Sequence, residues 1–375
     1  HALGVLVGEI LREQCGDRLF DLVEGNRVDA IRRREGDPDG AASLVARAGG
    51  RAPAEARDLV RAFSTWFQVV NLAEKVHRIR RRRQYLNDTS HPQPGGLEDA
   101  LLRLQRDGRS WEELCALLAR ICIYPVFTAH PTESTRRTIL RKQQHVARLL
   151  LERLDPSMTP VERRATWEQI RTELTSGWQT EEHPRERLTV ADEREHVLFY
   201  LAEILYRVVP AFYEEFAAAV HKVYGVDVAP LDLPRMLRFG SWVGGDMDGH
   251  PDVHAKTIRE TLQRQHLVLV NEYFVEMQQL GERLSQSANR VAVSAELAAR
   301  IAEYATHRGR HAGLFHVERL MRRVDTFGFH LATLDVRQHA DVHRLVVAQG
   351  LGDPDFVRRA PQERLARLRL ALERD

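Results

Sequence analysis

Three short segments interrupt a sequence that otherwise has mostly helical periodicity, and they limit the folds open to the chain. Residues 121–130, 235–251 and 327–338 each mix β-branched, aromatic and leucine residues, and each ends abruptly in polar or charged residues. A helix-like stretch follows each segment, which is the pattern of βα units around a parallel sheet or barrel. The chemistry of such barrels lies where the strands end. We therefore expect short parallel strands near 123–128, 236–243 and 329–336.

Helical periodicity is clearest between residues 54 and 83, where apolar residues recur at spacings of three and four. This spacing predicts one long helix with an apolar stripe facing the core. The stripe consists of Leu59, Phe63, Phe67, Val70, Ala73 and Val76. Two further helices are predicted to begin at capping boxes, in which Thr159 pairs with Glu162 and Thr189 pairs with Asp192.

The composition is that of a globular protein, with 43% hydrophobic and 29% charged residues. No apolar run approaches the roughly 20 residues that a membrane span needs, so we expect no membrane partner. A net charge of +2 and a basic run at residues 78–85 without interleaved aromatic residues argue against a nucleic-acid partner. Cys15, Cys115 and Cys122 lack metal-ligand spacing. They are expected to be buried, reduced thiols, which favours a cytoplasmic location.

The first polar cluster lies in YPVFTAHPTESTRRTIL, residues 124–140. His130 precedes a proline, so its backbone is extended and the strand can continue up to it. Thr132 is then expected to cap a helix whose first N–H groups and positive dipole end point to the strand end. Arg136 and Arg137 are expected about one turn into that helix, where guanidinium groups bind phosphate or carboxylate oxygens. The alternative is a strand-turn-helix corner whose arginines pair with surface acids, and the spacing leaves both interpretations open.

The second cluster, GSWVGGDMDGHPDV at residues 240–253, combines glycines with two aspartates. Glycine permits a close approach of the backbone to a ligand. The segment lacks the alternating oxygen ligands and final glutamate of an EF-hand calcium loop. The alternative is a tight turn in which Asp246 and Asp248 accept hydrogen bonds from backbone amides and Trp242 belongs to the core.

The third cluster, LDVRQ at residues 334–338, places Asp335 and Arg337 two apart and therefore on the same face of a strand. An arginine directed into a barrel mouth must be paired or must meet an anionic ligand. The alternative to an anion site is therefore an internal Asp–Arg pair.

In this order, the three clusters resemble the motifs of the phosphoenolpyruvate carboxylase family. VFTAHPTESTRR is similar to that family's histidine signature, T-A-H-P-T-E/Q-x-x-R-R/K, and matches it at every fixed position. GSWVGGDMDGHPDV resembles the family's G-S-W-x-G-G-D-R-D-G-N-P motif, and LATLDVRQ resembles its L-D-I-R-Q element. Similarity in LREQCGDRLFDLVE and FSTWFQVVNLAEKVHRIRRRR extends the resemblance over essentially all 375 residues. Met247 and His250 depart from the pattern, in which the family has arginine and asparagine.

The resemblance implies a mostly helical chain in which the first strands of a (β/α)8 barrel are embedded among many additional helices. Residues 1–120 would form a helical outer layer, and residues 121–375 the first barrel strands with inserted helices. The family's chains are much longer, and their later half carries a mobile loop and the metal ligands. The sequence stops within a helical pattern. We therefore expect this chain to be a truncated amino-terminal portion of one large barrel domain, inactive by itself.

The resemblance also implies a reaction, the carboxylation of phosphoenolpyruvate with bicarbonate to oxaloacetate and phosphate, catalysed by a carbon–carbon lyase. Its cofactor would be Mg²⁺ or Mn²⁺, with ligands expected outside this chain. Because every intermediate is anionic and hydrolysable, such a site needs fixed cations and exclusion of water. By motif match, His130 would act near carboxyphosphate and carbon dioxide, Arg337 would neutralise the substrate phosphate, and Trp242 would form an apolar wall. The basic cluster that some members use for an activating sugar phosphate or for subunit contacts is matched by Arg136, Arg137 and Arg194.

The resemblance further implies a homo-oligomer, which is a tetramer in the family. Two other interpretations of the sequence stay open. One is a non-catalytic anion-binding or regulatory module that keeps the anion pocket without the metal-binding half. The other is a different barrel enzyme that acts on a phosphorylated or enolic small acid.

Overall fold

A computed structural model describes residues 1–88, 91–128, 136–181, 189–248, 252–284 and 313–372. The chain divides into two compact units, the first formed by His1–Gln93 with Thr135–Arg185 and the second by Pro94–Ser134 with Glu186–Asp375. The expected division into an outer helical layer and a barrel part stays a prediction.

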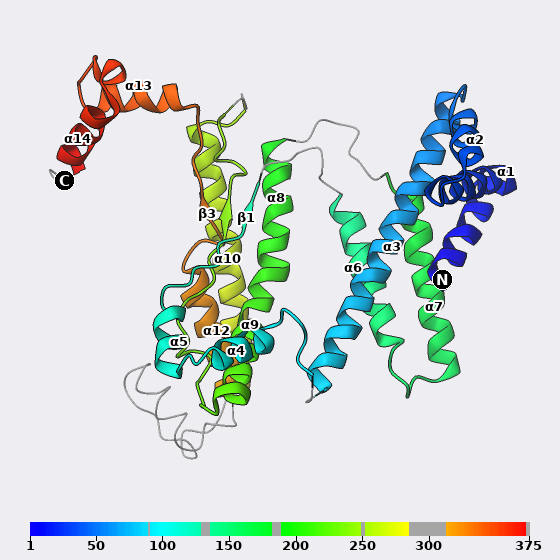
Figure 1. The fold of residues 1–375 in the computed structure, drawn as a ribbon, viewed down its shortest axis with the longest axis horizontal. Coiled ribbons are helices and arrows are strands. Elements are labelled where there is room, and N and C mark those ends of the chain that lie inside the picture. The colour runs from blue at the N-terminus through cyan, green and yellow to red at the C-terminus, as the bar shows by residue number, and fades with distance from the viewer. Residues whose placement is uncertain (89–90, 129–135, 182–188, 249–251, 285–312, 373–375) are drawn as a thin grey trace. The chain divides into compact units, whose positions relative to one another are not determined.

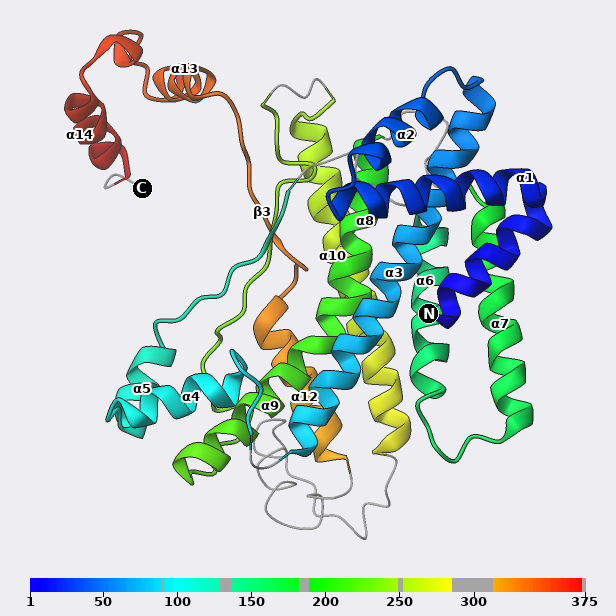
Figure 2. The ribbon, with the colours of Figure 1, turned by 45° about the vertical axis from the view of Figure 1, so that its right-hand side comes forward.

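The first unit consists of helices that pack through one apolar core. They are α1 (Ala2–Arg34), α2 (Pro38–Ala48), α3 (Pro53–Asn87), α6 (Arg137–Glu152) and α7 (Pro160–Gln179). Figures 1 and 2 show α3, α6 and α7 running side by side. The buried side chains between these helices include Leu6, Ile10, Val69, Val146, Ile170 and Trp178. Helix α1 is interrupted at Gly16, whose φ of 78° is a conformation that favours glycine.

The capping boxes predicted from sequence are confirmed, but the predicted buried face of α3 is wrong. The Thr159 side chain accepts from the Glu162 N–H, and Thr189 accepts from the Asp192 N–H. On α3 the fully buried residues are Ala62, Val69 and Leu72. Phe67 and Val70, which belong to the predicted stripe, are exposed. The helix carries apolar residues on more than one face, so spacing alone does not identify the face that meets α1 and α6.

The second unit is also mostly helical. Its helices are α4 (Leu97–Arg106), α5 (Trp111–Leu118), α8 (Val190–Tyr200), the π-helical turn η2 (Leu201–Leu205), α9 (Tyr206–Tyr224), α10 (Ala255–Arg283), α12 (Leu314–Phe327), α13 (Ala340–Gly350), the 3-10 turn η3 (Phe356–Arg358) and α14 (Pro361–Leu372). Figures 1 and 2 show α8 and α10 side by side. Tyr206 and Tyr213 of α9, Leu269 of α10 and Leu331 lie at the centre of the apolar core.

A small parallel sheet runs through this unit. Strands β1 (Val126–Phe127), β2 (Gly240–Ser241) and β3 (Thr333–Leu334) pair in the order β1-β2-β3, with β2 in the middle. Isolated bridges, Ile123 to Leu237 and Asp246 to Arg337, extend the pairing beyond the strands. The predicted parallel strands, and the mostly helical fold around them, are therefore confirmed.

Arg323 connects three helices of this unit, α9, α10 and α12. Pro210 lies inside α9 and has no N–H to donate to the carbonyl of Tyr206, four residues earlier. Arg323 Nε of α12 donates to that carbonyl instead, at 2.9 Å, and its Nη1 pairs with Glu276 of α10 at 2.8 Å. The cost of a proline within α9 is thus offset by a side chain from the helix that leads into β3.

The three cysteines are free and exposed, which contradicts the prediction of buried thiols. Cys115 shows the reason, because it lies on α5 beside the buried Leu114 but on the outer face of that helix. In the part of the chain that the structure describes, no helix combines the length and the apolar character that crossing a bilayer requires.

Tyr213 of α9 completes the hydrogen bonding at the start of the middle strand. Its hydroxyl oxygen accepts from the backbone N–H of Met236 at 2.9 Å and of Leu237 at 3.4 Å. The Tyr213 side chain is fully buried, so no water can replace it. A buried N–H without a partner costs free energy. Tyr213 therefore connects the helical core to the strand that carries the second sequence cluster.

We predict that Tyr213→Phe lowers the free energy of unfolding by about 1–3 kcal/mol, since the buried N–H of Met236 and the partly buried N–H of Leu237 lose their acceptor. Chemical denaturation monitored by circular dichroism measures the loss. Tyr224→Phe is the matched control on the same helix, because the Tyr224 hydroxyl has no hydrogen-bond partner among the described residues. Equal losses in both variants would contradict the role assigned to Tyr213.

Candidate functional site

The candidate site lies where the three parallel strands end. Trp242 directly follows β2, and its N–H donates to the Phe127 carbonyl of β1 at 2.8 Å. Arg337 follows β3, and its N–H donates to the Gly245 carbonyl at 2.9 Å. The Met247 N–H donates to the Arg337 carbonyl at 2.8 Å, so Asp246 stands directly opposite Arg337. His130 follows β1 in the sequence but lies outside the described residues.

The structure brings Trp242 and Arg337 together. The guanidinium carbon of Arg337 lies 3.8 Å from the centroid of the Trp242 ring, which is the geometry of a cation–π contact. Arg337 Nη1 donates to Asp246 Oδ2 at 3.0 Å. The Arg337 side chain is 42% exposed and that of Asp246 is 20% exposed, so the pair lies at a partly open surface. The arrangement presents a fixed cation at the strand ends.

The partner of Arg337 differs from the one that the sequence suggested. The internal pair considered above joined Asp335 to Arg337, two residues apart on one strand. In the structure Arg337 pairs with Asp246 of the glycine-rich loop, and Asp335 Oδ1 lies 3.5 Å from the Tyr124 hydroxyl. Directly opposed residues on neighbouring strands have closer side chains than residues two apart on one strand, and this favours Asp246.

Two glycines allow the loop to pack closely, Gly245 against the segment at the end of β3 and Gly244 against α10. A Cβ at Gly245 would clash with the backbone oxygen of Asp335, and one at Gly244 would clash with the Thr261 hydroxyl. Gly244 also has a φ of 81°, which side chains rarely adopt. The tight-turn interpretation holds in part, because Asp246 Oδ1 accepts from the Asp248 N–H at 3.3 Å. Gly245 thus allows the close approach that places Asp246 opposite Arg337.

An aromatic cluster that the sequence analysis did not single out lies beside the end of β1. The Tyr200 ring stacks on Phe127 with centroids 6.3 Å apart, and His196 meets Tyr200 edge-on at 5.2 Å. Burial lowers the pKa of the His196 imidazole and raises the pKa of the Tyr200 phenol. Both groups are therefore held neutral at neutral pH. The only sequence signal was the spacing of four residues between them on one helix.

The predicted anion-binding arginines lie in different units. Arg136 is the N-cap of α6 with extended backbone and Arg137 is its first residue, so the expectation that they lie one turn into a helix is wrong. Arg136 Nη1 donates to the Glu181 carbonyl at 3.4 Å. Arg137 lines a surface hollow of about 390 Å³ with Arg141, Lys142 and His145. Arg194 belongs to the second unit, and its Nε lies 3.8 Å from Glu195.

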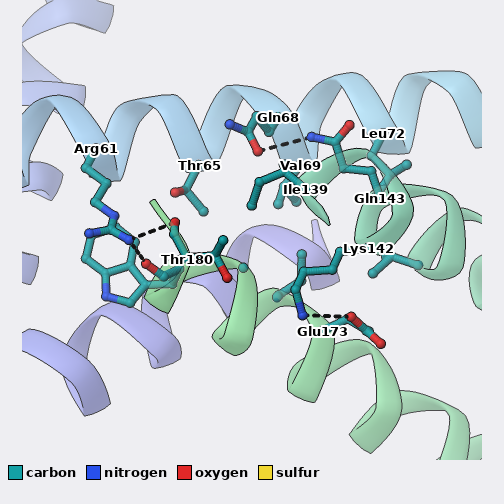
Figure 3. A pocket seen from close by; sticks show the side chains of 14 residues that line it. Arg61, Thr65, Gln68, Val69, Leu72, Ile139, Lys142, Gln143, Glu173 and Thr180 are labelled. Carbon is teal, nitrogen blue, oxygen red and sulfur yellow. Dashed lines mark hydrogen bonds and ion pairs between the residues drawn. The ribbon is translucent and has the colours of Figure 1, made fainter. Parts of the chain in front are cut away.

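A second cavity lies in the first unit between α3, α6 and α7, and Figure 3 shows the side chains around it. Its volume is about 40 Å³, enough for a few waters. The polar groups around it bond one another: Gln143 donates to Gln68 at 3.1 Å, and Lys142 pairs with Glu173 at 3.3 Å. Arg61 donates to backbone carbonyls at the end of α7. These contacts describe packing between helices better than a ligand site.

Among the residues that the structure describes, no group of three or more His, Cys, Asp or Glu side chains is placed to hold a metal ion. Asp246, the carboxylate nearest to Arg337, already uses one oxygen for the guanidinium and the other for a backbone N–H. The described part of the site therefore offers a cation and an apolar ring, and it offers no metal-ligand set.

Comparisons with known proteins agree with the sequence motifs. The family model described as phosphoenolpyruvate carboxylase matches residues 1–312 and 304–373. A phosphoenolpyruvate carboxylase of Xanthomonas euvesicatoria pv. vesicatoria is 44% identical over 414 residues, covering 94% of this chain and 45% of the relative. Those of Xanthomonas campestris pv. campestris and Ralstonia nicotianae are 43% and 36% identical, covering 94% and 92% of this chain. The chain spans less than half the length of these curated relatives, 45% and 42% of them.

We predict that Gly245→Ala destabilises the second unit by about 1–3 kcal/mol, because the added methyl group overpacks against the backbone of Asp335, directly after β3. Gly281→Ala is the control, since a Cβ there meets nothing within 4 Å on helix α10. That substitution should stabilise the protein by about 0.5–1 kcal/mol. Thermal unfolding of both variants tests the sign of each change, and a Gly245→Ala protein as stable as the parent would contradict the close approach.

Proposed function

Because the chain belongs to the phosphoenolpyruvate carboxylase family, we propose that it supplies part of the active site of an enzyme that carboxylates phosphoenolpyruvate. Bicarbonate is the second substrate, and oxaloacetate and phosphate are the products. One observation carries the proposal: Arg337 is held on Trp242 at the ends of the parallel strands, with its Nε and Nη2 without a hydrogen-bond partner among the described residues. These groups fit the phosphate of the substrate.

In the proposed reaction a bicarbonate oxygen attacks the phosphorus atom, and the bond from phosphorus to the enol oxygen breaks. The products of this step are carboxyphosphate and the enolate of pyruvate. Carboxyphosphate then releases carbon dioxide, and the enolate carbon attacks it to form oxaloacetate. Negative charge moves between oxygens throughout, so a fixed cation at the phosphate stabilises each stage more than mobile water does.

We propose the following roles for the residues of this chain. Arg337 binds the phosphate oxygens and orients the phosphoryl group for attack. Trp242 keeps water from one side of the pocket and holds the guanidinium in place through its ring. His130 acts near carboxyphosphate and the carbon dioxide that it releases. Phe127 and Tyr200, which stack beside the end of β1, extend the apolar wall.

The metal ion of the family, Mg²⁺ or Mn²⁺, would neutralise phosphate and enolate charge when bound. We propose that its ligands belong to a part of the enzyme outside this chain. Among the described residues, no three candidate ligands come together.

We propose that the three strands are the first strands of a (β/α)8 barrel. The observation that supports this is the exposure at both edges of the sheet, where Ile123 and Tyr124 before β1 and Val336 after β3 are partly or largely exposed. Further parallel strands could pair with either edge. We also propose a cytoplasmic homo-oligomer. In it, Arg136 and Arg137 of the first unit, and separately Arg194 of the second, would bind an allosteric anion or contact another subunit.

In the intact enzyme we predict that Arg337→Ala raises the KM for phosphoenolpyruvate by roughly 10- to 150-fold and also lowers kcat. The estimate corresponds to losing about 1.5–3 kcal/mol from a hydrogen bond to a charged group. A coupled assay for oxaloacetate measures both constants. Arg344→Ala is the matched control, because Arg344 pairs only with the exposed Asp341 among the described residues.

His130→Asn should give a different result in the same assay. It should keep most of the affinity for phosphoenolpyruvate and reduce kcat by about 10²–10⁴-fold, as expected for a group that acts after the substrate has bound. Release of phosphate without oxaloacetate would persist, since carboxyphosphate can form and then hydrolyse. If His130→Asn lowered only the melting temperature and kept full turnover, the histidine would have a structural role and the proposal would be wrong.

A further inference from the structure

Asp246 makes contacts that no role in the proposed reaction explains. Its Oδ2 accepts from Arg337 Nη1 at 3.0 Å, and its Oδ1 accepts from the Asp248 N–H at 3.3 Å. The backbone of Arg337 is bonded on either side of Asp246, to the Gly245 carbonyl and the Met247 N–H. Backbone hydrogen bonds therefore hold Asp246 opposite Arg337, and a further hydrogen bond holds each of its two carboxylate oxygens.

This carboxylate determines which edge of the Arg337 guanidinium is free. The guanidinium group is planar and offers paired N–H groups along its edges. Asp246 contacts Nη1 only, so the Nε–Nη2 edge has no partner among the described residues. The Trp242 ring lies 3.8 Å from Cζ and limits how far the group can move. With Cζ over the ring and Nη1 bonded to Asp246, few directions remain for the free edge.

We propose that Asp246 is a positioning residue for Arg337. It holds the guanidinium over the Trp242 ring, so that the Nε–Nη2 edge is presented to the two oxygens of a phosphate group. This inference rests on the proposed function of Arg337. It predicts that the carboxylate improves substrate binding although its negative charge opposes an anionic substrate. A carboxylate that only screened Arg337 would have the opposite effect.

The test uses the intact enzyme and the KM and kcat for phosphoenolpyruvate. Asp246→Ala should raise KM by on the order of 10- to 100-fold, because a binding group displaced by about 1 Å loses this much. Asp246→Asn is the second variant, since its side-chain oxygen can still accept from the Asp248 N–H and preserve the turn. It should raise KM less than Asp246→Ala does. Asp341→Asn, which changes an exposed aspartate on α13, is the matched control and should leave KM unchanged.

A double-mutant cycle separates positioning from a purely structural role. In an Arg337→Ala background, Asp246→Ala should have little further effect on KM, because the group that it orients is gone. A full additional loss in that background would show that Asp246 acts through the loop, and the inference would be overturned. A fall in KM on Asp246→Ala would also overturn it, since it would show that the carboxylate competes with the substrate.

The same measurements distinguish this inference from the proposed function. If Arg337→Ala raises KM and neither Asp246 variant does, Arg337 binds the phosphate without help and only the positioning role fails. If Arg337→Ala leaves KM unchanged, the proposed function of Arg337 fails, and the positioning role fails with it.

Discussion

The backbone hydrogen bonds that join Arg337 to residues 245 and 247 determine where the rest of the site lies. They continue the parallel pairing beyond β2 and β3, and they place Asp246 opposite Arg337. Gly245 allows this close pairing, since a Cβ there would clash with the backbone oxygen of Asp335, while Gly244 packs against Thr261 of α10. The Arg337 guanidinium then lies over the Trp242 ring. The glycines therefore affect the proposed chemistry only through the backbone geometry that they allow.

The Asp246–Arg337 pair contributes more to orientation than to stability. Ion pairs at exposed positions contribute about 0–1 kcal/mol, and this pair is partly exposed. A cation–π contact adds a similar amount at such sites. The folding of the second unit does not depend on the ion pair or the cation–π contact, because buried residues of α9, α10 and the segments around the strands form its core. Together, however, the two contacts restrict a flexible side chain to one arrangement, which is what binding a phosphate group requires.

The local features of the fold could be predicted from sequence because their causes are local. Thr159 and Glu162 form a capping box wherever the backbone turns into a helix, and short runs of β-branched and aromatic residues between helices indicate strands. The buried face of α3 could not be predicted, because it depends on which neighbours cover the helix. The exposure of Cys115 depends on its environment in the same way.

The sequence indicated individual residues of the candidate site, but it did not indicate how all of them contact one another. The motifs indicated Trp242 and Arg337, and parallel strands require their ends to meet at one edge. The partner of Arg337 was not predictable, because Asp246 is remote in sequence and meets it through sheet register. The placement of Arg136 as the N-cap of α6 likewise depends on where the helix begins, which spacing left undetermined.

The most direct test of the account is a crystal structure of the intact enzyme with a non-reactive phosphonate analogue of phosphoenolpyruvate. Two phosphonate oxygens are expected within hydrogen-bond distance of Nε and Nη2 of Arg337. The guanidinium should still lie over Trp242, and Nη1 should still contact Asp246. A phosphonate bound away from the ends of β1, β2 and β3, with Arg337 making no contact to it, would contradict the account.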